Sequence, residues 1–124
     1  MRETFREGGG FEEAAAYSRA VRIGRHVAVS GTAAREGGDA YAQAGEAIGR
    51  ALEAARRLGA AKEDVLRTRL LLAPGCDWEG VVRAHAEAFA GVEPANTTYF
   101  VSGFIPEGVL VEVELDAVVP EPPR

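Results

Sequence analysis

The sequence contains little cysteine and little histidine. Cys76 is the one cysteine among 124 residues, so the chain cannot form an internal disulfide, and a reducing cytoplasm suits it. Cys76 has no partner at C-x-x-C spacing, and the two histidines, His26 and His85, lie far apart. No set of side chains therefore has the spacing of a metal site, and we expect no metal.

Long apolar runs and an excess of positive charge are also absent. No segment reaches the roughly 18 apolar residues of a membrane span. The N-terminal stretch MRETFREGGG has no apolar segment and does not resemble a signal peptide. Fourteen basic and nineteen acidic residues give a net charge of −5, and the basic residues are scattered. This charge weighs against a nucleic-acid partner, and we expect a cytoplasmic protein without a membrane partner.

The length predicts one domain over residues 1–124, with a modest core. Three consecutive glycines at residues 8–10 predict a mobile or sharply turning N-terminal segment over residues 1–16. Residues 120–124 form a short tail. The apolar fraction of 47% and the charged fraction of 27% are typical of a soluble globular protein.

The strongest pattern lies at the C-terminal end. Residues 96–104 are rich in β-branched and aromatic side chains, and residues 109–119 alternate strictly. Two such runs around the turn at residues 105–108 favour an antiparallel hairpin. The alternation places Val111, Val113, Leu115 and Ala117 on one face and Glu112, Glu114 and Asp116 on the other. The acidic face fits a solvated surface, or else a cleft or oligomer interface.

Local signals predict the other elements. Residues 21–23 and 27–30 alternate around a glycine turn and favour a hairpin, with a further short strand near residues 4–5. Asp39 and Asp77 are N-cap residues of two helices that end before Gly59 and Gly91. The predicted apolar stripes are Ala44, Ile48, Ala51, Leu52, Ala55 and Leu58 for the first helix, and Trp78, Val81, Val82, His85 and Phe89 for the second.

Residues 65–72 form an apolar strand that contains Arg67 and Arg69. Alternation places both arginines on one face with Val65 and Leu71, opposite Leu66, Thr68, Leu70 and Leu72. Charges in such a strand need partners, and Glu112, Glu114 and Asp116 are the nearest carboxylates of the right kind. Right-handed crossings place both helices on one face of the sheet. The uncovered face, with Arg67 and Arg69, therefore suits an oligomer interface.

Several short motifs together resemble the RidA/YjgF family of reactive-intermediate (enamine/imine) deaminases, over residues 17–119. They are Tyr17-Ser-x-Ala-Val, Val29-Ser30-Gly31, Gly59-Ala60 before Asp64-Val65, Asp77-Trp78, Phe89, Pro94-Ala95, and Val111-Glu112-Val113-Glu114. The resemblance implies an α+β, chorismate-mutase-like fold with one mixed sheet and two helices on one face. It also implies a homotrimer whose sheets meet in a central barrel, with three ligand clefts between subunits.

Members of that family convert 2-imino or 2-enamino acids to 2-keto acids and ammonia without a cofactor. By resemblance, Glu112 positions the attacking water, and Tyr17 and Ser30 line the cleft. The family's carboxylate-binding arginine corresponds to Asn96, which supplies no charge. Val82 stands where the family has an asparagine that faces the cleft, and Thr98 stands where it often has a cysteine two residues after the arginine, so both are expected ligand-binding positions. His85 replaces a frequent tyrosine, and from the residues alone we favour a structural role for it.

Three functions remain open. The first is a trimer that binds a small metabolite, with weak or absent deaminase activity because Asn96 replaces the arginine. The second is an active deaminase in which Arg67, Arg69 or Arg22 binds the substrate carboxylate instead. The third is an endoribonuclease-like inhibitor of translation, which the acidic charge disfavours. We rank them in this order.

Overall fold

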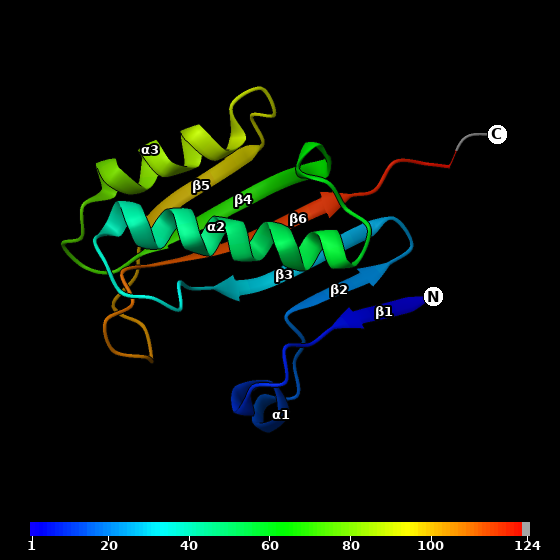
Figure 1. Cartoon of the computed structure of the whole chain (residues 1–124), viewed down its shortest axis with the longest axis horizontal. Coiled ribbons are helices and arrows are strands. Elements are labelled where there is room, and N and C mark those ends of the chain that lie inside the picture. Colours follow the sequence, from blue (N-terminus) through cyan, green and yellow to red (C-terminus); the bar gives the residue numbers. More distant parts are fainter. Residues whose placement is uncertain (123–124) are drawn as a thin grey trace.

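Within residues 1–122, six strands form one mixed sheet in the order β1-β2-β3-β6-β4-β5, and two long helices cover one of its faces (Figure 1). This computed structural model describes residues 1–122, so residues 123 and 124 of the predicted tail lie outside the described residues. The elements are β1 Arg2–Phe5, α1 Gly10–Ala15, β2 Ala20–Ile23, β3 His26–Thr32, α2 Ala40–Arg57, β4 Val65–Leu72, α3 Trp78–Phe89, β5 Ala95–Phe100 and β6 Val111–Val118. The predicted α+β architecture, a mixed sheet with two helices on one face, is confirmed.

The predicted C-terminal hairpin is wrong. β6 lies in the middle of the sheet, antiparallel to both β3 and β4, whereas β5 pairs in parallel with the far side of β4. β5 and β6 are therefore separated by β4, and residues 101–110 cross between them. Because alternate residues of β6 are fully apolar, they are best buried in a central strand, where helices cover them.

The N-terminal segment contains regular structure. The short strand predicted near residues 4–5 is present as β1, which pairs antiparallel with β2. Helix α1 was not predicted, and it lies apart from the layer of α2 and α3 (Figure 1). The mobility predicted for residues 1–16 stays a prediction.

Both predicted N-caps are confirmed. The Asp39 carboxylate accepts a hydrogen bond from the Ala42 backbone N–H at 2.8 Å, and Asp77 does the same for Gly80 at 3.2 Å. The buried face of α2 consists mainly of alanines, which let the helix approach the sheet closely. On α3 the predicted stripe is partly wrong, because Trp78 is 51% and Val82 42% exposed. The buried face of α3 is formed instead by Gly80, Val81, Ala84 and Phe89.

The four-residue spacing of opposite charges on α2 predicts two ion pairs, Glu46 with Arg50 and Glu53 with Arg57, and one of them is present. Arg57 donates to Glu53 at 2.9 Å, as the spacing of four residues predicts. The pair between Glu46 and Arg50 does not form. The Glu46 carboxylate accepts from the backbone N–H groups of Arg35 and Glu36, and Arg50 reaches across to the N-terminal segment.

A bulge at the start of β4 changes which residues share a face. Val65 lies opposite Ala117, but Arg67 lies opposite Asp116, so Leu66 is an extra residue in the ladder. Val65 is consequently buried and Leu66 is 59% exposed. The prediction that Val65 shares the face of Arg67 and Arg69 is therefore wrong, as is the placement of Leu66 on the opposite face.

A buried glutamine fixes the segment that leads into β6. The Gln43 side chain of α2 accepts from the Leu110 N–H at 2.9 Å and donates to the carbonyls of Gly38 and Gly108, each at 3.1 Å. Because the Gln43 side chain is only 4% exposed, losing these bonds would leave a buried polar group without partners, which is costly. The end of the segment, at Gly108 and Leu110, is thereby held against α2. Among residues 1–122, no helix has the length and apolar character to cross a bilayer.

Gly45 offers a test of the α2 surface. It lies exposed inside the helix, and a Cβ built there meets no atom within 4 Å. Gly45→Ala should raise the free energy of unfolding by roughly 0.5–1 kcal/mol, since alanine loses less backbone entropy. Urea denaturation measures this change. The control Gly80→Ala should show no such gain, because its Cβ would lie 2.7 Å from Oδ2 of Asp77, the N-cap residue.

Candidate functional site

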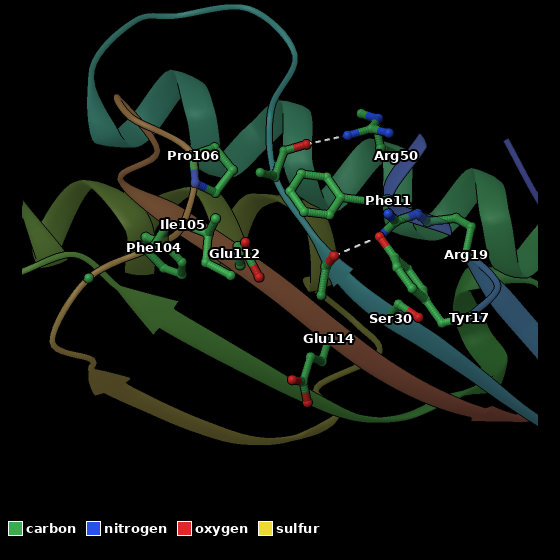
Figure 2. A pocket seen from close by; sticks show the side chains of 13 residues that line it. Phe11, Tyr17, Arg19, Ser30, Arg50, Phe104, Ile105, Pro106, Glu112 and Glu114 are labelled. Atoms are coloured by element: carbon green, nitrogen blue, oxygen red, sulfur yellow. Dashed lines mark hydrogen bonds between the residues drawn. The ribbon is translucent and has the colours of Figure 1, made fainter. Parts of the chain in front are cut away.

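A cavity of about 540 Å³ lies beside β3 and β6, between the segment that precedes β2 and the loop at residues 103–106 (Figure 2). Tyr17 and Arg19 precede β2, Ser30 and Gly31 lie near the end of β3, and Glu112 comes from β6. The remaining walls are formed by α1, by the loop after β3, by α2, by residues 103–106 and by a second β6 carboxylate, namely Phe11, Ala33, Arg50, Gly103, Phe104, Ile105, Pro106 and Glu114. Three residues predicted for the site, Tyr17, Ser30 and Glu112, are therefore brought together.

Glu112 is the group in this cavity best suited to proton transfer. Burial raises the pKa of Glu112 above its ordinary value, the positive charge of Arg19 opposes that rise, and the negative charge of Glu114 adds to it. The carboxylate lies against Gly31, where a Cβ would be only 2.6 Å from the Glu112 Oε1 atom. A side chain at position 31 would displace this carboxylate, so glycine is required for the observed geometry.

Ser30 is held by the segment that precedes β2. Its hydroxyl donates to the Ser18 carbonyl at 2.7 Å, and its N–H donates to the Arg19 carbonyl at 2.9 Å. The register between β3 and β6 shifts between Val29 and Thr32. This irregularity turns the end of β3 toward the cavity, as bulges beside sites commonly do.

Arg19 is a cavity residue that sequence reasoning missed. Its side chain is 12% exposed, donates to the Gly31 carbonyl at 2.6 Å and to the Thr32 hydroxyl at 3.1 Å, and lies over the Tyr17 ring (Figure 2). The one sequence signal was its position inside the Tyr17-Ser-x-Ala-Val motif, where an arginine fills the variable place.

The N-terminal segment supplies a carboxylate that joins three arginines behind the cavity. Glu7 contacts Arg19 at 3.3 Å, Arg35 at 3.0 Å and Arg50 at 2.8 Å. Arg50 also donates to the Ala33 carbonyl. The backbone N–H of Glu7 is bound in turn by the Glu12 carboxylate at 3.0 Å. Although burial opposes it, hydrogen bonds from backbone N–H groups hold the pKa of Glu12 below its ordinary value.

The other predicted ligand-binding residues lie elsewhere. Val82, Asn96 and Thr98 face the helix side of the sheet at its β5 edge, around a second cavity of about 420 Å³ that Trp78 and Phe100 also line. Figure 2 accordingly shows none of them. Within one chain, the predicted site residues thus form two separate groups on opposite sides of the sheet.

A chain of hydrogen bonds occupies the Asn96 amide. The Thr98 hydroxyl donates to the Asn96 oxygen at 2.8 Å, and the Asn96 nitrogen donates to the Thr68 hydroxyl at 3.0 Å. Thr68 is also 2.8 Å from the His85 Nε2 atom. Burial lowers the pKa of His85, so its ring is held neutral and is suited to accept from Thr68.

None of the arginines considered as replacements reaches Asn96 within one chain. The Arg22 guanidinium donates to the Leu58 carbonyl at 2.8 Å, and Arg69 lies 3.6 Å from Glu114 and 3.4 Å from Asp116. The pairing predicted for Arg69 is therefore present. Within residues 1–122 no ion pair forms for Arg67, although it lies opposite Asp116 in the ladder. Among the residues that the structure describes, no arginine lines the cavity beside Asn96.

The helix-free face of the sheet combines the charges of Arg69, Glu114 and Asp116 with exposed apolar side chains. Ile23 is 53%, Leu66 59% and Tyr99 42% exposed. In the part of the chain that the structure describes, no three His, Cys, Asp or Glu residues are grouped so that they could hold a metal ion. The interface role predicted for Arg67 and Arg69 stays a prediction.

Both the sequence and the fold have relatives among known proteins. The family model of endoribonuclease L-PSP matches residues 10–119. An uncharacterized protein of Streptomyces coelicolor is 43% identical over 116 residues, covering 89% of this chain and 87% of that protein.

The fold of this chain also matches those of solved structures. A Mycobacterium tuberculosis member of the YjgF/YER057c/UK114 family is 40% identical, with a TM-score of 0.91 over 96% of this chain and 100% of that one. A candidate endoribonuclease L-PSP of Entamoeba histolytica shares the fold at 24% identity, with a TM-score of 0.83 over 96% of this chain and 100% of that one.

The raised pKa of Glu112 predicts a pH-dependent stability. Its contribution to folding is complete below the ordinary pKa of 4.5 and is lost as the pH rises through the raised value, because the folded state binds the proton more tightly. Glu112→Gln cannot titrate. The variant should match the wild type near pH 4 and exceed its free energy of unfolding at pH 7, as measured by urea denaturation.

A control for net charge is Glu13→Gln, which removes an exposed carboxylate from α1. If both variants gain the same free energy of unfolding relative to the wild type between pH 4 and pH 7, the gain comes from the change in net charge and not from the burial of Glu112.

Proposed function

Because this chain belongs to the endoribonuclease L-PSP family, the YjgF family of its solved relative, we propose that it is a cytoplasmic homotrimer that binds a small metabolite. The ligand site is a cleft between subunits, and 2-imino or 2-enamino acid deaminase activity in it is weak or absent. No cofactor takes part in this proposal. The observation that supports it is the division of the site residues into two groups on opposite sides of one chain.

A neighbouring subunit would join the two groups. The cavity at Glu112 is open, and the β5 edge with Asn96 carries exposed Trp78 and Phe100. In a closed ring, each chain presents one edge to the next, so the β5 edge of one subunit can lie against the Glu112 cavity of its neighbour. The apolar and charged side chains of the uncovered sheet face would be buried at the centre of the same ring.

The chemistry of the cavity supports a water-activating role for Glu112. In imine hydrolysis, water adds to the imine carbon, a base takes the proton, and the carbinolamine releases ammonia to leave a carbonyl group. A carboxylate with a raised pKa is suited to take and return that proton. Tyr17 and Ser30 would supply neutral polar contacts to the ligand. Asn96 offers no positive charge, so an anionic substrate would be held weakly.

A role on RNA is the lesser candidate. A protein of Rhodopseudomonas palustris with the same fold is described as a probable translation initiation inhibitor, at 18% identity, with a TM-score of 0.76 over 95% of this chain and 92% of that one. In this chain, the net charge of −5 and the carboxylates of Glu112 and Glu114 would repel phosphates. We therefore rank metabolite binding first.

The proposed assembly predicts that analytical ultracentrifugation gives a trimer at micromolar concentration. Arg69→Met should weaken the trimer roughly tenfold or more, about 1.4 kcal/mol, because Glu114 and Asp116 lose their partner at an interface. Arg57→Met on α2, which removes an exposed pair away from the sheet face, is the control and should leave assembly unchanged. A monomeric wild type would contradict the proposal.

The proposed activity predicts that Asn96→Arg increases deaminase activity. A charge-assisted contact to the substrate carboxylate contributes about 1.5–3 kcal/mol, so kcat/KM should rise up to roughly a hundredfold. The assay follows ammonia release from 2-iminobutyrate or 2-aminoacrylate generated in situ. Asn96→Gln is the matched control, because it lengthens the side chain without adding charge. If the wild type is already fast and Asn96→Arg gives no gain, another group binds the carboxylate.

A further inference from the structure

We infer that Arg19 is a positioning residue for Glu112: its guanidinium fixes the Gly31 backbone against which the Glu112 carboxylate lies, and supplies the positive charge beside that carboxylate. The role of Glu112 in this inference rests on the function proposed above. The geometry of Arg19 itself does not depend on which ligand binds.

Arg19 is immobilised by protein acceptors at the end of β3. Its Nη1 atom donates to the Gly31 carbonyl at 2.6 Å and to the Thr32 hydroxyl at 3.1 Å. Thr32 is fully buried, and its hydroxyl donates to the Ser30 carbonyl at 2.7 Å. The guanidinium therefore holds the irregular end of β3, where the ladder to β6 changes register.

Gly31 transmits this fixed position to Glu112. The carboxylate oxygen approaches Gly31 so closely that a Cβ there would lie 2.6 Å from it. Arg19 binds the carbonyl of the same residue. The position of Gly31, and with it the surface that supports the Glu112 carboxylate, therefore depends on the Arg19 hydrogen bonds.

Arg19 acts through Glu112 and does not itself bind the ligand. Its side chain is 12% exposed, and the Glu7 carboxylate lies 3.3 Å from its Nε atom. Nε is fully buried and makes no hydrogen bond within residues 1–122. Because Nη1 donates to Gly31 and Thr32 and Nε is buried beside Glu7, Arg19 is poorly placed to bind a ligand carboxylate in a bidentate manner.

The charges around Glu112 show what Arg19 contributes. Glu114 lies two residues further along β6 and is paired with Arg69 of β4. Among residues 1–122, Arg50 of α2 and Tyr17 are the other titratable or charged groups that line the cavity. Burial and Glu114 raise the pKa of Glu112, and Arg19 lowers it. Arg19 thus favours the ionised carboxylate, the form that accepts a proton from water.

The experiment is a pH titration of the folded protein by ¹H–¹⁵N NMR, with the Gly31 amide as reporter of Glu112 ionisation. Arg19→Gln should move the Gly31 midpoint to higher pH, because the compensating charge is lost. Arg19→Lys retains that charge and should return the midpoint toward the wild-type value. An unchanged midpoint in Arg19→Gln would overturn the inference.

Arg22→Gln is the matched control for structural damage. Arg22 lies in β2, three residues after Arg19, and likewise donates to a backbone carbonyl, that of Leu58, but it lies outside the cavity. Its replacement should lower stability without moving the Gly31 midpoint. An equal shift in both variants would mean that Arg19 is only a structural residue.

A wild-type measurement covers the case in which Arg19→Gln does not fold. In the wild type, the chemical shift of the buried Arg19 Nε–H group should change with pH at the same midpoint as that of the Gly31 amide. In Glu112→Gln, neither chemical shift should show this midpoint. Absence of this shared midpoint would also overturn the inference. Neither measurement needs a ligand or an activity, so failure of metabolite binding and failure of this inference are distinguishable.

Discussion

The central position of β6 is the constraint on which the candidate site depends. Four of its side chains, at positions 111, 113, 115 and 117, are at most 1% exposed beneath the helices. Because side chains of a strand alternate, this burial forces Glu112, Glu114 and Asp116 together onto the opposite face. Like charges in one row are unfavourable unless cations lie nearby. Arg69 from β4 and Arg19 from the segment just before β2 supply those cations.

The N-terminal segment connects this sheet face to the rest of the molecule. Glu7 reaches three arginines from different parts of the chain, and Glu12 holds the backbone of Glu7 in place. A charged side chain with several ionic partners contributes more to stability than one with a single surface partner, because the entropy cost of fixing it is offset by several contacts. Residues that precede the sheet core therefore hold Arg19 and Arg50, two arginines of the cavity, and Phe11 of α1 lines the same cavity (Figure 2).

Elements with strong local signals were predicted well, and strand partners were not. The N-caps Asp39 and Asp77, the helices behind them and the alternation of β6 all follow from short patterns. The hairpin prediction failed because a turn signal at residues 105–108 says nothing about which strand lies alongside. The face of Leu66 was wrong because a single bulge reverses the alternation, and a bulge leaves no mark in the pattern of apolar residues.

For the site, the sequence by itself determined the acidic face of β6 and a family resemblance that nominates Tyr17, Ser30 and Glu112, and these three residues share one cavity. Only the tertiary structure separated Asn96 from that cavity and brought in Arg19. The physical reason is the range of the interactions. Alternation and caps arise between residues a few positions apart, whereas a cavity and its charges depend on the packing of segments distant in the chain, which no local pattern encodes.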